Sequence, residues 1–115
     1  MDEQLGQELE LLHNRVCTAF ADPKRMHILY VLAKGPHYVN EMADALGLPQ
    51  STVSRHLKIL RERGLVTTSR EGTSVYYALA DERIIKAMDL LRAVLHDRVM
   101  ESARLVDYSE TMKPT

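Results

Sequence analysis

Residues 50–61 combine short polar and cationic side chains in a pattern that suits the reading of DNA bases. Glutamine can pair bidentately with adenine and arginine with guanine, while serine and threonine hydroxyls suit a base or a phosphate. Val53, Leu57 and Leu60 fall at i, i+4 and i+7, so they define the buried face of a predicted helix. The candidate DNA-contacting residues of this helix are Gln50, Ser51, Thr52, Ser54, Arg55, His56, Lys58 and Arg61.

These residues have alternative interpretations when they are taken alone. The whole set could be an ordinary solvated helix face. His56 could contact a phosphate, or it could pack against the preceding helix. Arg70 and Thr73, at the tip of a predicted hairpin, are further candidates for phosphate contact, although a plain turn suits Thr73 equally well. The neighbouring elements therefore decide the interpretation.

A second helix and a tight turn precede the reading helix. One apolar face recurs over residues 39–46, and Gly47 with Leu48-Pro49 then ends that helix and redirects the chain. The segment 39–63 is therefore predicted as a helix-turn-helix, in which the second helix enters the DNA major groove.

Two strands follow the reading helix. Residues 65–68 and 75–79 are rich in β-branched and aromatic side chains, which is typical of strands, and Glu71-Gly72 supplies a turn. Residues 65–80 are therefore predicted as a β-hairpin wing that reaches the neighbouring DNA backbone.

Long helical apolar stripes lie at both ends of the chain, in the predicted helices 1–20 and 81–106. A chain of 115 residues is too short to bury both stripes within itself, so we expect two copies to pair across a two-fold axis. The residues expected in this dimer contact are Leu5, Leu9, Leu12, Val16, Met88, Leu91, Leu95 and Val99.

The predicted fold class is α+β and mostly helical, a winged helix-turn-helix with a two-stranded wing and long N- and C-terminal dimerisation helices. A helix between the first stripe and residue 39 begins at Asp22-Pro23, an N-cap followed by proline at the first helical position. We expect a single domain over 1–108 and a flexible tail over 109–115.

Charge is distributed unevenly although the net charge is only −1. Residues 50–75 carry five bases against two acids, whereas residues 1–22 carry one base against five acids. The positive charge therefore coincides with the predicted reading helix and wing, as expected of a DNA-binding face.

Composition excludes several classes of protein. A single cysteine, Cys17, allows no intrachain disulfide, and the acidic N-terminus has neither a signal peptide nor a membrane span. No Ser-His-Asp set or glycine-rich phosphate loop can be built from the chain, so we expect no enzyme activity and no cofactor. A cytoplasmic protein that does not associate with membranes is the expectation.

This order of elements resembles the ArsR/SmtB family of bacterial winged-helix repressors. The resemblance implies a homodimer that binds a double-stranded DNA operator near a promoter and releases it when a metal ion or another small effector is sensed. The residues that carry it are Ala21-Asp22-Pro23-Lys24-Arg25, Ile28-Leu29, Glu41-Met42-Ala43, the run from Ser51 to Leu60, Gly64-Leu65-Val66, Arg70-Glu71-Gly72 and Tyr76-Tyr77.

The metal sites of such repressors lack ligands in this sequence. Tyr38-Val39-Asn40 stands where some members carry Cys-Val-Cys, and in the site that others begin with Asp-x-His, Arg83 and Val94 cannot bind a metal. His13 and Cys17, four residues apart on the first helix, are the remaining candidates, with a buried thiol beside a surface histidine as the competing interpretation. We therefore expect no bound metal.

The leading functional hypothesis is a dimeric, sequence-specific DNA-binding repressor. The alternative is a winged-helix module that binds protein or RNA without operator specificity. The sequence leaves open the operator and its genes, the effector, repression versus activation, and whether Cys17 acts as a sensor.

Overall fold

The computed structural model describes residues 2–112, and the side chains of the last helix are described as far as Arg104. The chain divides into two units, residues 1–82 and the part that begins at Arg83, and each is described by itself. The single domain expected over residues 1–108 stays a prediction.

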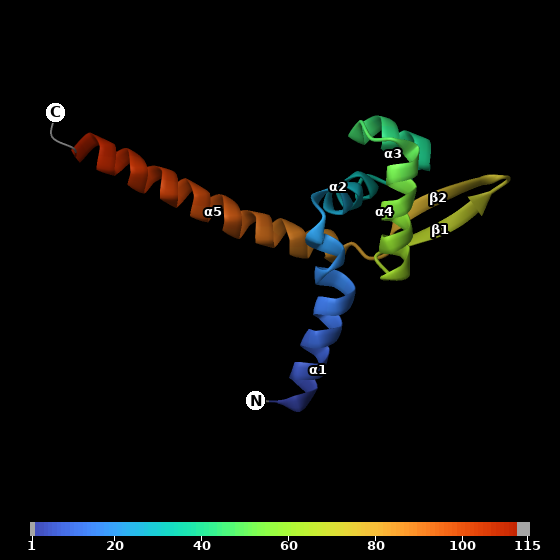
Figure 1. The fold of residues 1–115 in the computed structure, drawn as a ribbon, viewed down its shortest axis with the longest axis horizontal. Helices are drawn as coiled ribbons and strands as arrows, with labels where there is room; N and C mark the ends of the chain where they lie inside the picture. The colour runs from blue at the N-terminus through green and yellow to red at the C-terminus, as the bar shows by residue number, and fades with distance from the viewer. Residues whose placement is uncertain (1, 113–115) are drawn as a thin grey trace. The chain divides into compact units, whose positions relative to one another are not determined.

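The first unit begins with three short helical segments (Figure 1). Helix α1 covers Glu3–Leu12, a π-helical turn follows over His13–Cys17, and a 3₁₀ turn covers Ala19–Ala21. The helix expected over residues 1–20 is therefore present over residues 3–17, with its last turn π-helical, and it does not continue to residue 20.

Backbone bonding at Thr18 accounts for this change of helix type. Its N–H donates to the carbonyl of His13, five residues back, at 3.0 Å, and its Oγ1 donates to the carbonyl of Asn14 at 2.7 Å. A hydroxyl that bonds back to the preceding turn often bends a helix, and a five-residue bond defines the π turn. Residues 13–19, called the junction below, therefore redirect the chain between α1 and α2.

Helix α2 covers Pro23–Leu32 and begins as the sequence predicts. The carboxylate of Asp22 accepts a hydrogen bond from the N–H of Lys24 at 2.9 Å, and Pro23 takes the first helical position. This bond, the largest influence on the group, lowers the pKa of Asp22, and the charges of His56, Arg25 and Lys24 act in the same direction.

The predicted helix-turn-helix is present as α3 (Val39–Leu46) and α4 (Gln50–Glu62). The carboxylate of Glu41 accepts a hydrogen bond from the N–H of Tyr38 at 2.9 Å, which caps the start of α3. Gly47 ends α3 with a φ of +66°, a left-handed conformation that side chains disfavour. Pro49 precedes α4 without a side-chain cap.

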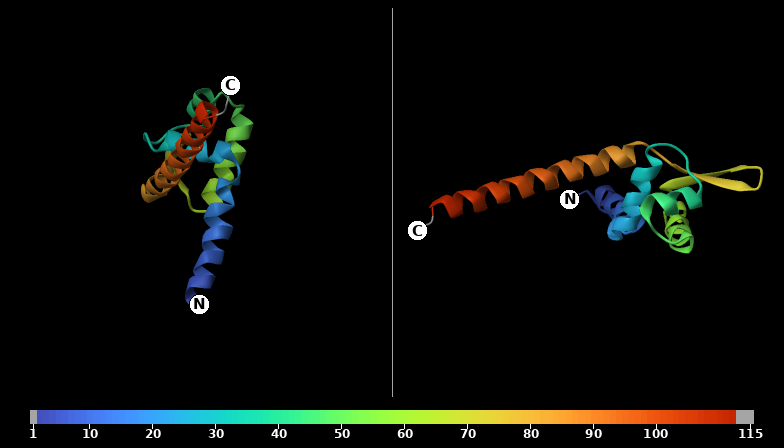
Figure 2. Two further views of the ribbon diagram at one scale, coloured as in Figure 1. Left: turned by 90° about the vertical axis from the view of Figure 1, so that its left-hand side faces the viewer. Right: turned by 90° about the horizontal axis from the view of Figure 1, so that it is seen from above.

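The wing consists of β1 (Val66–Glu71) paired antiparallel with β2 (Ser74–Leu79), and it projects from the helices as a two-stranded ribbon (Figures 1 and 2). Glu71 pairs with Ser74, so the turn is Gly72-Thr73, one residue later than predicted. Gly72 has a φ of +64°, which suits the first position of a two-residue hairpin turn. The hairpin is thus longer and tighter than the sequence predicts.

The core of the first unit lies between α2, α3, α4 and the base of the wing. It contains the inward face of the reading helix that the sequence predicts. The buried side chains include Ile28, Leu29 and Leu32 from α2, Met42 and Ala43 from α3, Val53, Leu57 and Leu60 from α4, and Leu65 and Val66 at the base of the wing.

The second unit is one long helix, α5, over Arg83–Met112. It extends beyond the predicted end at residue 106, so residues 109–112 are helical rather than a flexible tail, and residues 113–115 lie outside the described part. Met88 is only 2% exposed in the single chain, and its assignment to the dimer contact stays a prediction. Among the described residues, no helix has the length and apolar character needed to cross a membrane.

Candidate nucleic-acid interface

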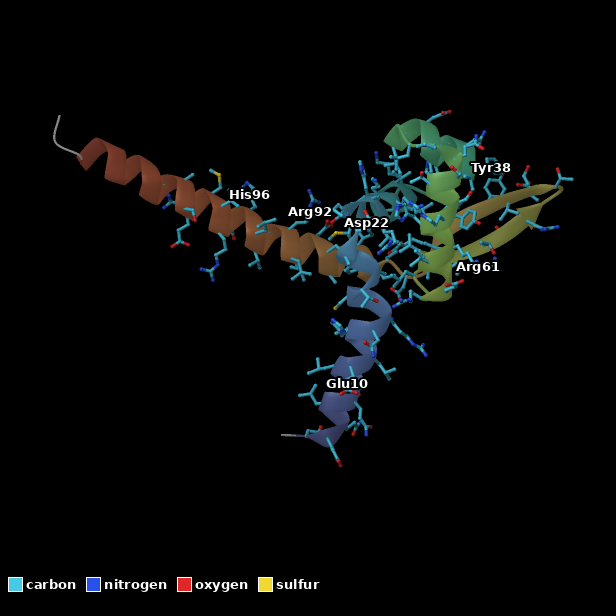
Figure 3. The ribbon with its side chains drawn as sticks, in the orientation of Figure 1. Glu10, Asp22, Tyr38, Arg61, Arg92 and His96 are labelled. Carbon is cyan, nitrogen blue, oxygen red and sulfur yellow. The ribbon has the colours of Figure 1, made fainter. Side chains whose placement is uncertain are left out.

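Helix α4 separates its two faces as the reading-helix hypothesis requires. Val53, Leu57 and Leu60 are buried, whereas the opposite face is open to solvent. Figure 3 labels Arg61 in the last turn of α4. The exposed members of the candidate set are Gln50, Ser51, Ser54, Arg55, Lys58 and Arg61, and Thr52 is half-buried. We call these seven residues the reading face.

The cations of the reading face are free to meet an external anion. Within the described part of the chain, Arg55, Lys58 and Arg61 have no carboxylate within ion-pair distance. A cation without an internal partner keeps its full attraction for a phosphate or a guanine edge. The face is therefore positively charged and chemically available to DNA.

His56 does not belong to this face. Its side chain is buried, and its ring lies against the start of α2 rather than towards solvent. Nδ1 lies 3.3 Å from a terminal nitrogen of Arg25, and Nε2 lies 3.7 Å from a carboxylate oxygen of Asp22. The buried position of His56 contradicts the predicted DNA contact in this conformation and supports the alternative of packing inside the protein, where Asp22 and Arg25 at the start of α2 are its polar neighbours.

Burial lowers the pKa of His56, and the cations Arg25, Arg55 and Lys24 act in the same direction. Asp22 opposes them, because its negative charge favours the imidazolium. The net direction is downward, so the folded protein favours the neutral ring.

The wing is held to the start of α3 by aromatic and backbone contacts. The rings of Tyr38 and Tyr76 stack with centroids 4.0 Å apart, and Figure 3 labels Tyr38 beside the hairpin. His37 and Tyr77 exchange two backbone hydrogen bonds, of 3.0 and 2.8 Å. Side-chain hydrogen bonds with Tyr38 and Glu71 raise the pKa of Tyr76. These contacts fix where the wing leaves the helical core.

The predicted wing contacts, Arg70 and Thr73, are both exposed. Arg70 also lines a shallow hollow with Pro36, Ser69, Glu71 and Tyr76. A cation at this place can approach the backbone of a DNA duplex whose major groove holds α4. The assignment of Arg70 and Thr73 to phosphate contact stays a prediction.

Two arginines that the sequence analysis did not single out connect the junction to the helical core. Arg25 donates from Nε to the carbonyl of Ala19 at 2.7 Å and from a terminal nitrogen to the carbonyl of Thr18 at 3.3 Å. Arg63, which follows α4, donates to Thr18 Oγ1 at 2.5 Å and to the carbonyl of Asn14. The π turn that creates these acceptors has no clear signal in the sequence, so the contacts could not be predicted.

The candidate metal ligands His13 and Cys17 lie at the two ends of the π turn, and both are exposed. The predicted alternative of a buried thiol is therefore wrong. Among the described residues, no three histidine, cysteine or carboxylate side chains gather as a metal-binding group.

The helix-turn-helix, the hairpin behind it and the cationic reading face define a winged-helix DNA-binding protein. Residues 22–68 match the family model "Bacterial regulatory protein, arsR family". The chain is 45% identical over 82 residues to the HTH-type transcriptional regulator CmtR of Mycobacterium tuberculosis, covering 70% of each protein. It is 41% identical over 78 residues to NmtR of the same species, covering 68% of this chain and 63% of that regulator. The chain therefore belongs to the arsR family of transcriptional regulators.

Solved structures agree with this assignment. A homodimeric winged helix-turn-helix DNA-binding domain from Mycobacterium bovis, described as a possible ArsR-family regulator, is similar with a TM-score of 0.75 and 32% identity, over 88% of this chain and 93% of that one. NolR from Sinorhizobium fredii is similar with a TM-score of 0.71 and 32% identity, over 82% and 93% of the two chains. The predicted family, fold class and function as a DNA-binding transcriptional regulator are confirmed.

Proposed function

We propose that this regulator acts in the cytoplasm as a homodimeric repressor that reads an operator with α4 and contacts the flanking backbone with the wing. The observation that carries the proposal is the reading face, because its polar and cationic side chains are exposed while the other side of the same helix is buried. Two such helices, related by a two-fold axis and one helical turn of DNA apart, would read a pseudo-palindrome.

The apolar stripes supply the second half of the proposal. Leu5, Leu9 and Leu12 of α1 are between 42% and 49% exposed, and Leu91, Leu95 and Val99 of α5 between 56% and 65%. Contiguous apolar surface of this kind marks an interaction site in a soluble protein. A second copy of the chain is the occupant that we propose, supported by the homodimeric relative of known structure. Val16, half-buried in the π turn, extends the stripe on the first helix.

Selection from a pool of random DNA duplexes tests the proposed function. We expect the wild-type protein to enrich one pseudo-palindromic sequence and to bind it at least about a thousandfold more tightly than random DNA, as specific regulators do. Affinity should fall steeply with salt, because binding releases counterions from the phosphates. Enrichment of no sequence, or equally tight binding to single-stranded RNA, would favour a protein- or RNA-binding module instead.

Release of the operator by an effector can be tested through the lone thiol. If a thiol-reactive signal acts, we expect it to need Cys17, so Cys17→Ser should abolish release and leave operator affinity unchanged. The measurement is a titration of zinc, nickel, cadmium, arsenite and peroxide against the complex of each protein with the selected duplex. Release of both proteins by stoichiometric zinc would instead reveal a metal site made by histidines and carboxylates. Release by none of these agents would leave an organic effector.

A further inference from the structure

His56 is a buried titratable group outside the reading face, although it lies in the middle of the reading helix. Its burial leaves 3% of the residue exposed. The ring is surrounded by charge: Asp22, Lys24 and Arg25 act on it from the start of α2, and Arg55 acts on it from α4 itself. Figure 3 labels Asp22 at this place. The packing of α4 against the start of α2 therefore depends on whether the ring of His56 carries one proton or two.

The hydrogen-bonding roles around His56 permit one neutral form. A guanidinium only donates, so the Nδ1 atom that faces Arg25 at 3.3 Å must be the unprotonated acceptor. The proton then resides on Nε2, which has no hydrogen-bond partner among the described residues but points at the Asp22 carboxylate 3.7 Å away. A second proton, on Nδ1, would set an N–H donor against the Arg25 guanidinium and place two positive charges together.

Arg25 connects this ring to the junction. Its other two donating nitrogens are held by the carbonyls of Thr18 and Ala19, so the guanidinium bridges the end of the N-terminal helical segments and the centre of α4. Loss of the bond to His56 would release α4 from this bridge without releasing Arg25 from the junction. The bond between Arg25 and His56 therefore helps to position the reading helix.

We propose that Arg25 and His56 are positioning residues for the reading helix, and that operator affinity falls when His56 takes up a proton and the bond to Arg25 is lost. The inference rests on the proposed function, because it requires α4 to be the element that reads DNA. The inference predicts that the regulator dissociates from its operator as the pH is lowered.

The direction of the effect separates this inference from simple charge attraction. A proton added to any histidine near DNA raises attraction for the phosphates, so the ordinary expectation is tighter binding in acid. Loss of the bond between Arg25 and His56, which positions α4, would instead weaken binding to DNA in acid. His56 contributes to the free energy of unfolding in the same direction. Because its pKa is lowered in the folded protein, the unfolded chain binds more protons at this group between that lowered pKa and about pH 6.5. The contribution of His56 to stability is therefore fully present above about pH 6.5 and is lost as the pH falls through this window.

The first test compares wild type with His56→Asn and His27→Asn, using the duplex selected by the wild-type protein at pH 8. The Oδ1 atom of asparagine can accept the bond from Arg25 but does not titrate. His27 is exposed on α2, so its replacement removes an exposed imidazole and leaves the contact intact. Affinities are measured from pH 8 to pH 5.5 at constant salt, and each is divided by that of His56→Asn at the same pH.

We expect this ratio to fall about threefold to tenfold for wild type and for His27→Asn, which corresponds to one hydrogen bond of ordinary net strength. A ratio that stays constant or rises in acid would overturn the inference. Circular dichroism first establishes that each variant is folded over the range.

A second measurement uses only wild-type protein, so it does not depend on a variant that folds. Nitrogen-15 NMR of the imidazole follows the titration of His56 with and without the selected duplex. Since DNA would favour the neutral form, linkage requires His56 to titrate at lower pH in the complex, and free His56 should carry its proton on Nε2. Titration at the same or higher pH in the complex would overturn the inference. Failure to select any duplex would instead be a failure of the proposed function.

Discussion

Leu95→Glu in α5 is expected to yield a monomer that binds the selected duplex about a hundredfold or more weakly than wild type, because two linked reading helices gain this much or more over one. The side chain is 63% exposed in the single chain, so a glutamate costs the folded monomer little. In a dimer contact the same carboxylate would be buried without a partner, which is strongly unfavourable. Sedimentation equilibrium at micromolar concentration measures the association, and fluorescence anisotropy measures the affinity for DNA.

Leu90→Glu is the matched control for this variant. Leu90 is 70% exposed on the same helix, but it lies five residues from Leu95 and therefore about 140° around the helix, off the predicted stripe. We expect it to remain dimeric and to bind the duplex as wild type does. A wild-type protein that sediments as a monomer, or a dimeric Leu95→Glu, would contradict the assignment of this face.

Local sequence signals predicted the parts of the fold that depend on them. Asp22 followed by Pro23, Gly47 with its left-handed backbone, and the i, i+4, i+7 spacing of α4 each mark an element boundary or a buried face through the geometry of neighbouring residues. The same reasoning predicted the wing but shortened its strands. Polar residues such as Ser69 carry no strand signal, and pairing with β2 decides their conformation.

Contacts between distant residues explain what the sequence did not predict. Periodicity gives only an approximate face for His56, and its burial follows from Arg25, 31 residues away, reaching across from α2. The end of α1 depends on a five-residue backbone bond from Thr18 that no residue type requires. The apolar stripe of α5 remains exposed at Leu91, Leu95 and Val99 in the single chain. A helical pattern identifies apolar faces but does not say whether the same chain or a partner covers them.

Arg55→Ala is expected to relax sequence preference and to weaken binding to the selected duplex by about five- to a hundredfold, because a bidentate contact to a base contributes about 1–3 kcal/mol of discrimination. Arg55 is exposed on the reading face beside Ser54, and no carboxylate within the described residues competes for its guanidinium. Lys34→Ala, which removes an exposed cation after α2, is the control and should leave the preference unchanged.

Affinities for the selected duplex, its single-base variants and random DNA separate the outcomes. An equal loss on selected and random DNA would make Arg55 a phosphate contact, since such contacts weaken all sequences alike. No loss on either DNA would remove Arg55 from the interface and would count against α4 as the reading helix.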